Sequence, residues 1–394
     1  MVDGPLTHLR VLELGTLIAG PFCGQLFGDM GADVIKIEPP GVGDPMRSWG
    51  RGLPVWWPVI ARNKRCITLN LRVPAGQELL KRLLQDSDVL IENFRPGTME
   101  KWGLDYEVLS AINPGLVMVR VSGFGQSGPY SSRAGYGSIG EAMGGIRYLA
   151  GDPDRPPSRV GLSIGDSLAA TFACVGALAA LHERDRTGQG QVVDSAIYEA
   201  VLAVMESTVP EYTEGGEIRE RSGAILPKIA PSNVYPTADD DSIVMGANQD
   251  SVFRRLAEAM GDPSLAEHPD YADHVSRGEH QEELDELIGR WTITLDADAL
   301  LQQLEAHGVP AGRIYRAPEM LEDPHFQARE SIVDVDHPAF KNLKMQNIFP
   351  KLSRSQGKIR WPGPELGAHN AEIYRDLLEI SDETLQDLIH DGVV

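Results

Sequence analysis

The sequence predicts an α/β fold, in which a large parallel β-sheet domain covered by helices is joined to a smaller α+β unit. Two observations support this prediction. Short apolar runs alternate with helical segments through the first third of the chain, which is the pattern of strands connected by helices. A polar stretch with two glycines, residues 211–222, then precedes a second group of elements that begins near Pro231. A chain of 394 residues is long enough for two or three compact units.

Five apolar runs in the first third are the predicted strands of the sheet. They span residues 9–14, 33–38, 67–71, 89–92 and 116–121. The segment between the first two begins with the turn Gly20-Pro21 and ends at Gly31, which are typical limits of a helix. This alternation is typical of nucleotide-binding folds, whose ligands bind at the carboxyl ends of the strands.

Asp166 begins the next predicted helix, residues 166–184, whose apolar residues recur at helical spacing before the loop 187–190. An aspartate at this place commonly caps the helix by accepting hydrogen bonds from the amides of the first turn, which is the simplest interpretation of Asp166. A capping aspartate can also take part in a reaction, because the same amides and the helix dipole favour an ionised carboxylate. The segment 191–207 that follows fits either a strand or a helix.

The second unit is predicted to open with a hairpin at residues 233–248. Helices are expected at 251–260, 281–291 and 296–307, a further strand at 331–337, and an amphipathic helix over 371–389. The chain contains no internal repeat and no long segment of low complexity.

The net charge of −21 argues against nucleic acid and anionic membranes as partners, because both bind cationic surfaces. Between Lys36 and Lys101, however, 11 lysines and arginines face 7 aspartates and glutamates, a local excess of four positive charges. This region is a candidate site for a ligand with phosphate groups, although solvated surface charge explains the excess equally well.

The cysteines and the first residues of the chain predict the compartment. Cys23, Cys66 and Cys174 are far apart and form no C-x-x-C pair, so neither a disulfide framework nor a zinc site is indicated. The first residues lack the basic start and apolar run of a signal peptide, and no stretch approaches the roughly 18 uncharged apolar residues of a membrane span. We therefore expect a cytoplasmic protein without a metal.

Two common motifs do not account for the sequence. Residues 15–20 match neither the G-x-G-x-x-G of dinucleotide folds nor a P-loop, so NAD and ATP lose support. Residues 161–165 match the G-x-S-x-G elbow of α/β-hydrolases, with Ser163 in the place of the nucleophile. That elbow requires a buried strand directly before it, whereas residues 152–160 are charged and contain three prolines. We interpret this match as coincidental.

Seven segments, in order along nearly the whole chain, resemble the class III CoA-transferase family (CaiB/BaiF, formyl-CoA transferase-like), which also includes α-methylacyl-CoA racemases. They are residues 11–47, 63–76, 92–106, 143–166, 186–200, 308–329 and 364–370. Each segment is loosely defined, but seven in sequence are specific. The resemblance implies a Rossmann-like domain formed by residues 1–225 and 319–394, a small α+β domain at 226–318, and an interlocked homodimer.

The resemblance also implies an acyl-CoA:carboxylate CoA-transferase. The family's nucleophile is the acidic residue that ends an R-V-G-x-x-x-x-D motif, and the matching residue here is Asp166. Its attack on an acyl-CoA would form a mixed anhydride and then an aspartyl-CoA thioester, which an incoming acid reverses. CoA enters only as the thioester substrate and product. The donor could be a dicarboxylyl-CoA such as succinyl-CoA, with Arg47, Arg133 or Arg159 as candidates to receive its second carboxylate.

The family's CoA contacts correspond to residues in the locally basic region. Arginine and lysine side chains would bind the phosphates and apolar ones would line the adenine, and the matching residues are Leu69, Arg72, Asn93, Phe94, Arg95 and Lys101. Surface charge and core packing are the alternatives, the latter especially for Leu69. Pro39 departs from the family pattern, because some transferases have an arginine there for the nucleotide.

The acyl pocket is less well defined by the resemblance. Ile18 stands where formyl-CoA transferase has a glutamine that touches the reacting groups. The loop 245–249 corresponds to the one that covers the reacting aspartate, and Asn248 or Gln249 could contact an acyl carboxylate, although an ordinary hairpin loop explains it as well. The absence of that glutamine at position 18 and the residues of the loop 245–249 both differ from formyl-CoA transferase. These differences favour an acid other than formate or oxalate.

Two alternative functions remain open at this point. Racemases of this fold pair the aspartate with a histidine in a G-H-D segment, but here the segment is Gly135-Tyr136-Gly137. Tyrosine, with a reference pKa of about 10, is poorly matched to that proton transfer, so Tyr136 is expected to line the acyl pocket or to pack. A non-catalytic acyl-CoA binding protein, the second alternative, would have no use for Asp166.

Overall fold

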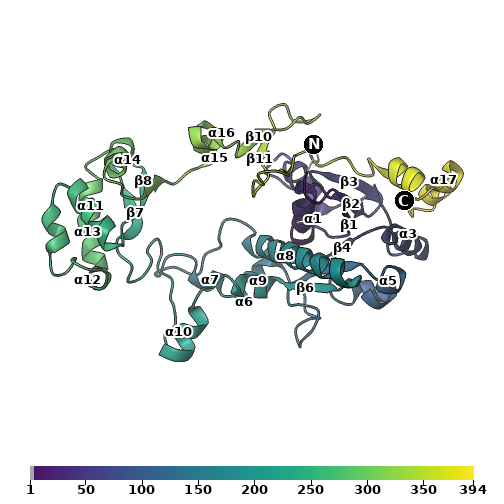
Figure 1. Ribbon diagram of the computed structural model, residues 1–394, viewed down its shortest axis with the longest axis horizontal. Coiled ribbons are helices and arrows are strands. Elements are labelled where there is room, and N and C mark those ends of the chain that lie inside the picture. Colours follow the sequence, from purple (N-terminus) through teal and green to yellow (C-terminus); the bar gives the residue numbers. More distant parts are fainter. Residues whose placement is uncertain (1–3) are drawn as a thin grey trace. The chain divides into compact units, whose positions relative to one another are not determined.

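A parallel sheet of six strands forms the centre of the larger part of the chain in the computed structural model, which describes residues 4–394 (Figure 1). The strand order is β3-β2-β1-β4-β5-β6, and all neighbours are parallel. The strands are β1 (Arg10–Glu13), β2 (Asp33–Glu38), β3 (Lys64–Thr68), β4 (Val89–Glu92), β5 (Val117–Ser122) and β6 (Val192–Ala196). The order reverses between β1 and β4, and ligands of such sheets bind at the carboxyl ends of the strands beside that reversal.

The predicted α/β fold is confirmed, and each of the five predicted strands is present. The sixth strand, β6, lies in the segment for which the sequence fitted a strand or a helix, and both occur there, because helix α9 (Ile197–Leu202) follows β6 directly. The other helices before the second sheet are α1 (Ala19–Asp29), α2 (Trp56–Ile60), α3 (Pro74–Leu84), α4 (Thr98–Lys101), α5 (Tyr106–Ile112), α6 (Gly137–Met143), α7 (Ile146–Leu149), α8 (Ile164–Thr187) and α10 (Thr208–Gly215).

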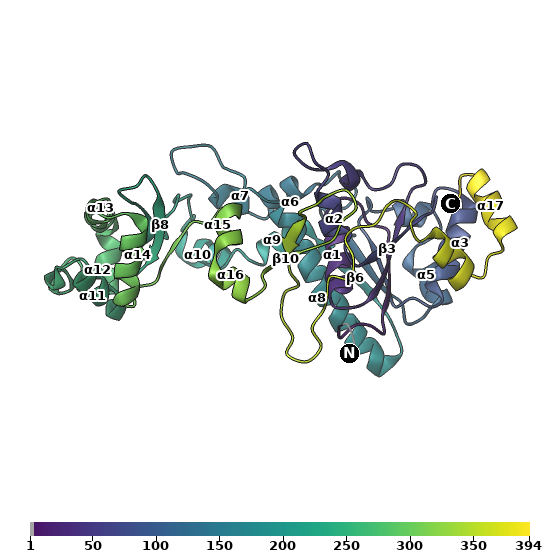
Figure 2. The ribbon, with the colours of Figure 1, turned by 90° about the horizontal axis from the view of Figure 1, so that it is seen from above.

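Helices cover both faces of this sheet, which is why its strands read as nearly continuous apolar runs. Along β1, Val11 packs among residues of α1 and α8, whereas the next residue, Leu12, packs among residues of α3 and α5. Successive side chains of a strand point to opposite faces, so each strand supplies both cores. Figure 2 shows α1 and α8 together on one side of the sheet, and α3, α5 and α17 (Asp382–His390) gathered on the other side.

Helix α8 requires a correction to the prediction about membrane spans. It is long and apolar enough to cross a membrane by length and composition. The core helix of a folded domain meets the same criterion, and 44% of its apolar window is buried. Its small residues pack in one cluster with α1 and the sheet, which explains its alanine content: Ala169, Ala170, Ala173, Ala177 and Ala180.

The second unit is built on an antiparallel sheet of order β7-β8-β9. The predicted hairpin is present as β7 (Ser232–Pro236) and β8 (Ser242–Gly246), and β9 (Ala311–Arg313) adds to β8. The helices of this part of the chain are α11 (Asp250–Ala259), α12 (His274–Glu279), α13 (Gln281–Thr292), α14 (Ala297–Ala306), α15 (Ala317–Glu322) and α16 (Pro324–Ala328). Apolar residues of α11, α13, α14 and the sheet form its own core.

The boundaries of the two units differ from the predicted positions 225/226 and 318/319. Tyr148–Arg159 and Glu217–Gln327 form the second unit, and the remainder of the described chain forms the first. Two hydrogen bonds explain why residues 148–159 join the second unit. The amide of Gly223 donates to the carbonyl of Gly151 at 3.1 Å, and the side chain of Arg221 donates to the carbonyl of Tyr148 at 2.8 Å.

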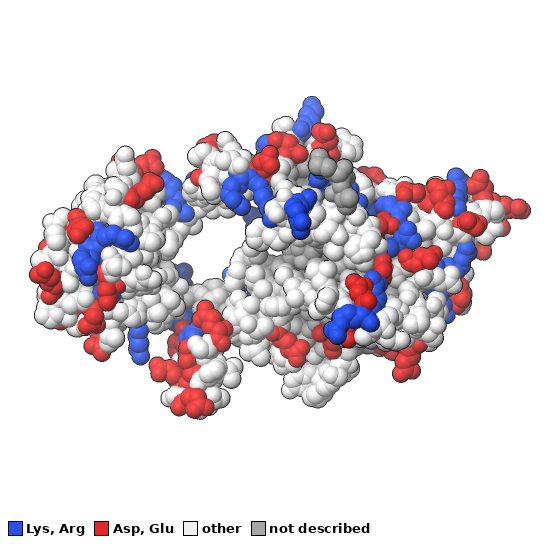
Figure 3. All heavy atoms as spheres, in the orientation of Figure 1, with Lys and Arg blue, Asp and Glu red and all other residues white. Residues whose placement is uncertain are grey.

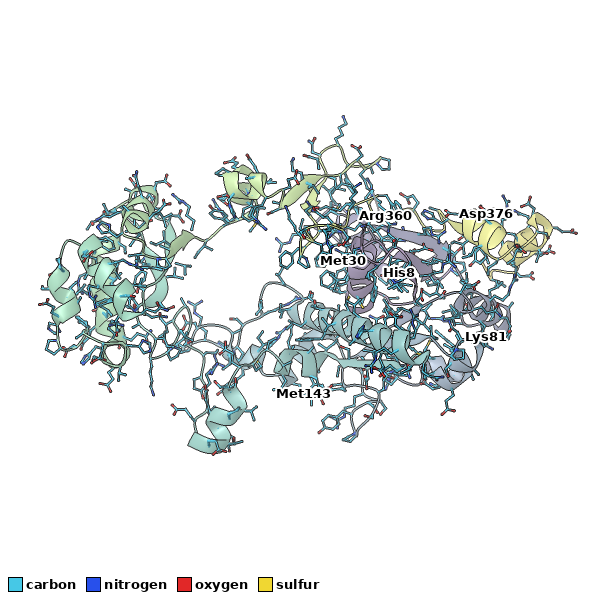
Figure 4. All side chains as sticks on the ribbon, viewed as in Figure 1. His8, Met30, Lys81, Met143, Arg360 and Asp376 are labelled. Carbon is cyan, nitrogen blue, oxygen red and sulfur yellow. The ribbon has the colours of Figure 1, made fainter. Side chains whose placement is uncertain are left out.

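The C-terminal segment returns to the first unit. A short antiparallel pair, β10 (Ile332–Asp334) and β11 (Lys344–Gln346), precedes the 364–370 segment, which binds β3. The Cys66 amide donates to Nδ1 of His369 at 3.1 Å, and the Thr68 amide donates to Oδ1 of Asn370 at 2.9 Å. Arg360 lies near Met30 at the end of α1 (Figure 4) and donates to the carbonyl of Ala32.

The single helix predicted over 371–389 is wrong. A π-helix at Glu372–Leu377 is followed by a turn in which Glu379 has a φ of 54°, and α17 then begins after Ser381. The Ser381 hydroxyl accepts a hydrogen bond from the Thr384 amide at 3.2 Å, so this serine caps α17 and divides the tail into two helices.

Candidate active site

Loops that follow β1 and β4 meet at the carboxyl edge of the parallel sheet. Asn93, directly after β4, joins them: its Oδ1 accepts from the Thr16 amide at 2.8 Å and its Nδ2 donates to the Thr16 carbonyl at 2.9 Å. The approach is close, because a Cβ atom on Gly15 would lie 3.1 Å from Oδ1 of Asn93. Asn93 therefore fixes the loop after β1, and its contact with CoA stays a prediction.

Asp166 lies within the first turn of α8 and is not its N-cap. The helix begins at Ile164, Ser163 occupies the N-cap position, and the Ser163 side chain makes no capping hydrogen bond. The simplest interpretation of Asp166 from the sequence is thus wrong, because the helix starts two residues earlier than predicted. Negative charge is favoured in this first turn by the helix dipole.

The carboxylate of Asp166 lies directly against the backbone of Gly137, the first residue of α6. A Cβ atom added to Gly137 would be 2.2 Å from Oδ2 and 3.0 Å from Oδ1 of Asp166. The segment that leads into α6 is held at the end of β5, since a Cβ atom on Gly123 would lie 2.8 Å from Cα of Gly135. This packing brings Asp166 to the carboxyl edge of the sheet. Tyr136, between these glycines, is 66% exposed and does not pack in the core.

Replacing Gly137 with alanine is expected to displace the Asp166 carboxylate, because its oxygens occupy the position of the new methyl group. A reacting group that is misplaced by about 1 Å can lower the rate by up to about a hundredfold. We expect kcat of any reaction at Asp166 to fall roughly tenfold or more, measured by steady-state kinetics. Gly289→Ala on α13, where a Cβ meets nothing within 4 Å, is the matched control and should leave kcat unchanged. Equal kcat values for the two variants would contradict this arrangement.

Glu141 and Arg147 lie next to the same turn of α8. Glu141 is 2% exposed and its Oε1 accepts from the Gly165 amide at 3.4 Å. Its Oε2 accepts from Nη2 of Arg147 at 3.2 Å and from Nε at 3.3 Å. No pattern in the sequence indicates this contact, because Glu141 and Gly165 are 24 residues apart.

Most of the predicted CoA contacts are accessible on the first unit. Arg72, Arg95 and Lys101 are exposed, and Phe94 is half-buried with its ring 5.3 Å from that of Trp102. Arg95 donates to the carbonyl of Ser132 through Nε at 3.0 Å and also through Nη2, which leaves Nη1 outside this contact. These positions keep the three cations available to a phosphate-bearing ligand.

Leu69 does not offer its side chain to a ligand. It is 2% exposed and belongs to the core cluster that also contains Leu71 and Leu79. The packing alternative, which the sequence left open, is the one that the structure supports for this residue.

The predicted acyl-pocket residues divide between the two units. Ile18 is half-buried at the N-terminus of α1 and packs against the cluster that contains Met46 and Trp57. Asn248 and Gln249 lie in the second unit, between β8 and α11, where the Asn248 carbonyl accepts from Nη2 of Arg277 at 2.8 Å. Their relation to Asp166 stays a prediction.

Arg47 is not available for the second carboxylate of a dicarboxylic acid. Its guanidinium donates to both carboxylate oxygens of Glu38 at 2.7 Å and to the carbonyl of Pro364 at 3.0 Å. It also lies over the ring of Trp57, with Cζ 3.8 Å from the ring centroid. Of the other two candidates, Arg133 stacks on Tyr130, whereas Arg159 lies in the second unit.

A cluster of buried charges lies beneath the loop after β1. Nζ of Lys36 is 2.9 Å from Oε1 of Glu13 and 2.9 Å from Oδ2 of Asp44, and it also donates to the Gly15 carbonyl. Nζ of Lys64 is 2.6 Å from Oε2 of Glu13. All four side chains are at most 1% exposed. The cluster therefore holds Gly15 and, through the Leu17 amide that donates to Asp44, the next part of the loop.

The electrostatics of this cluster keep Lys36 charged. Burial alone would lower its pKa, but the carboxylates of Glu13, Asp44 and Glu38 together raise the pKa above its ordinary value. For Lys64, burial dominates and lowers the pKa in spite of Glu13. Charged residues inside strands that are otherwise apolar, here Glu13, Lys36 and Lys64, were the signal in the sequence that could have revealed the cluster.

A cavity of 550 Å³ lies elsewhere in the first unit and contains none of the predicted site residues. It is lined by the C-terminal segment, chiefly residues 333–336 and 356–362. Among residues 4–394, no group of three histidine, cysteine, aspartate or glutamate side chains is arranged to hold a metal ion.

Comparisons with known proteins agree with this architecture. A sequence model described as CoA-transferase family III matches residues 6–370. Succinyl-CoA--D-citramalate CoA-transferase from Chloroflexus aurantiacus is 62% identical over 385 residues, 97% of this chain and 96% of that protein. Succinyl-CoA:mesaconate CoA-transferase from Haloarcula hispanica is 37% identical over 94% of this chain and 96% of that protein. The crystal structure of a CAIB/BAIF family protein from Brucella suis has a TM-score of 0.85 and 34% identity, over 95% of this chain and 100% of that one.

Proposed function

Because the chain belongs to CoA-transferase family III, we propose that this CoA-transferase moves CoA from succinyl-CoA to a second short dicarboxylic acid through a covalent intermediate on Asp166. The observation that supports the role of Asp166 is its place against Gly137 in the first turn of α8, at the carboxyl edge of the sheet. A carboxylate held there beside a thioester gains from proximity and from exclusion of water.

The proposed reaction conserves atoms in four steps. A carboxylate oxygen of Asp166 attacks the thioester carbonyl of the donor, CoA leaves as the thiolate, and a mixed anhydride remains. The thiolate attacks the aspartyl carbonyl, which forms an aspartyl-CoA thioester and releases the donor acid with one oxygen from Asp166. The acceptor carboxylate attacks that thioester, CoA leaves again as the thiolate, and the second anhydride forms. The thiolate then attacks the acceptor carbonyl, and the new acyl-CoA leaves one acceptor oxygen on Asp166.

Cationic side chains of the first unit would hold the CoA during these steps. Arg72, Arg95 and Lys101 are exposed, and charge-assisted hydrogen bonds to phosphate are among the strongest available to a protein. The ring of Phe94 would contact the adenine. CoA is substrate and product here, and the proposed steps use no metal or other cofactor.

Succinyl-CoA is the proposed donor because the relatives described above act with it, and their other substrates, D-citramalate and mesaconate, are also dicarboxylic acids. A matrix of acyl-CoA donors against free acids, analysed by mass spectrometry, tests this proposal. We expect the highest kcat/KM for succinyl-CoA with a citramalate-type acceptor, and weaker exchange with monocarboxylic acids such as acetate. If no pair of donor and acceptor shows CoA exchange, the proposed function is wrong.

A homodimer is part of the proposal, and the outward face of α8 supports it. Phe172, Val175 and Leu178 are exposed by 42%, 59% and 39% on the side away from the sheet. In the space-filling view, the charged side chains of this region gather over the C-terminal end of α8, and the rest of the helix shows few of them (Figure 3). A contiguous apolar surface of this kind is unfavourable in water unless another surface covers it. A second copy of the chain would bury this face in a symmetric contact.

Val175→Asp is expected to convert the dimer to a monomer, because the new carboxylate would be buried without a partner. Light scattering coupled to size-exclusion chromatography measures the change from two chains to one. Val108→Asp on α5, also at an exposed valine, is the control and should remain dimeric. A Val175→Asp variant that still has the mass of two chains would contradict the role of this face.

A cytoplasmic location completes the proposal. Cys23, Cys66 and Cys174 are buried free thiols, as is usual in a reducing compartment. Fractionation of the native cells should recover the protein with cytoplasmic markers, and recovery with the membrane fraction would contradict the proposal.

A further inference from the structure

Helix α8 receives its capping interaction from a distant residue. The N-cap residue Ser163 makes no capping bond with its side chain, and the Gly165 amide instead donates to Oε1 of Glu141, on α6, at 3.4 Å. The two helices are in close contact, because a Cβ atom on Gly165 would lie 3.0 Å from Cγ of Glu141. Gly165 immediately precedes Asp166, so Glu141 binds the backbone beside the proposed nucleophile.

Glu141 is itself fixed at its other oxygen. Both Nε and Nη2 of Arg147 donate to Oε2, at 3.3 and 3.2 Å, and the Glu141 side chain is 2% exposed against 28% for Arg147. A carboxylate that is buried and bonded through both oxygens has little freedom to move. Its negative charge also lies at the positive end of the α8 dipole, where it stabilises the helix terminus.

Glycines let α6 carry Glu141 to this position. Gly137, Gly140 and Gly144 follow one another at helical spacing, and a Cβ atom on Gly140 or Gly144 would lie 2.5 or 2.6 Å from side chains of α9. The helix is thus wedged between α8 and α9, with Gly137 under the Asp166 carboxylate and Glu141 one turn further along. Helix α6 therefore meets the first turn of α8 at two places, through Gly137 at Asp166 and through Glu141 at Gly165.

We propose that Glu141 is a positioning residue for Asp166: its Oε1 binds the Gly165 amide and so holds the first turn of α8, which carries Asp166, against α6. The same helix places Gly137 against the Asp166 carboxylate, so α6 holds both the backbone before Asp166 and the carboxylate itself. This inference rests on the proposed function, in which that carboxylate attacks the thioester.

Two substitutions of Glu141 test the inference. Glu141→Ala removes the acceptor and the partner of Arg147, and should lower kcat roughly 10- to 100-fold while KM for succinyl-CoA changes less than about twofold. Glu141→Gln keeps an acceptor oxygen for the Gly165 amide and should restore most of kcat. Arg184→Met is the matched control: it breaks the 2.7 Å pair with Asp88 at the opposite end of α8 and should leave kcat unchanged.

Trapping with hydroxylamine separates failure of the inference from failure of the proposed function. In the wild-type enzyme with succinyl-CoA, the trapped adduct should appear on Asp166, and in Glu141→Ala it should form more slowly by the same factor as kcat. No adduct on wild-type Asp166 would overturn the proposed function. A wild-type adduct, together with unchanged kcat and trapping rate in Glu141→Ala, would overturn the positioning role alone. Equal kcat losses in Glu141→Gln and Glu141→Ala would also overturn it, because the cap would then be irrelevant.

Discussion

Asp166→Ala is expected to lower kcat for CoA exchange by roughly a thousandfold or more, because it removes the atom that forms the covalent bond and not merely a stabilising contact. The carboxylate is on the first turn of α8 and contacts the backbone of Gly137, so its loss creates no cavity in the core. Exchange between succinyl-CoA and the acceptor acid, followed by mass spectrometry, measures the loss. Thermal unfolding and CoA binding by calorimetry should remain close to wild type.

A matched variant shows that the effect belongs to this carboxylate. Asp185→Ala removes an exposed carboxylate near the other end of the same helix, where only a weak 3.8 Å pair with Arg184 is lost. It should retain full kcat. If Asp166→Ala also retains kcat, then Asp166 does not carry the covalent intermediate.

Lys36→Met is expected to lower the free energy of unfolding by about 3–5 kcal/mol, the usual cost of removing one partner from a buried ion cluster. Glu13 and Asp44 would keep their charges in the interior without the ammonium that lies 2.9 Å from each. The loop after β1 would also lose the bond from Lys36 to the Gly15 carbonyl. Urea denaturation followed by circular dichroism measures the difference.

The control for this variant is a lysine whose ion pair is exposed. Lys81→Met breaks a 2.8 Å pair with Glu78 on the surface of α3, and such pairs contribute about 0–1 kcal/mol. Equal losses in the free energy of unfolding for Lys36→Met and Lys81→Met would show that the buried cluster contributes no more to stability than an exposed ion pair.

The parallel sheet could be predicted from the sequence because its strands are buried on both faces and bounded by turn residues. The strand from Val192 to Ala196 was ambiguous, since a helix follows it without a turn and periodicity cannot separate two elements joined in this way. The tail was predicted as one helix because its apolar spacing continues through the turn at Glu379. The start of α8 was placed too late because the Gly165 amide is bound by Glu141 of α6, which is far away in the sequence.

The candidate site was only partly predictable for a similar reason. Asp166 could be found through a motif, whereas the need for a glycine at position 137 depends on which side chain lies above it in space. Arg47 had the charge expected of a carboxylate receptor, but Glu38 and the Pro364 carbonyl occupy its donors. Leu69 fitted the adenine contact by its place in the motif, yet the core covers its side chain. For Gly137, Arg47 and Leu69, contacts with residues from other parts of the chain determine what each residue can reach, and such contacts cannot be predicted from a local motif.

The most direct test of the central claim follows oxygen atoms through the reaction. The enzyme is incubated with succinyl-CoA and an acceptor acid labelled with oxygen-18 in its carboxylates, and the peptide that contains Asp166 is then analysed by mass spectrometry. The covalent route deposits one acceptor oxygen on the aspartate in each turnover, so we predict oxygen-18 on Asp166 and, after several turnovers, in the released succinate. Rapid CoA exchange with no label on Asp166, or with the label on another carboxylate, would contradict the account.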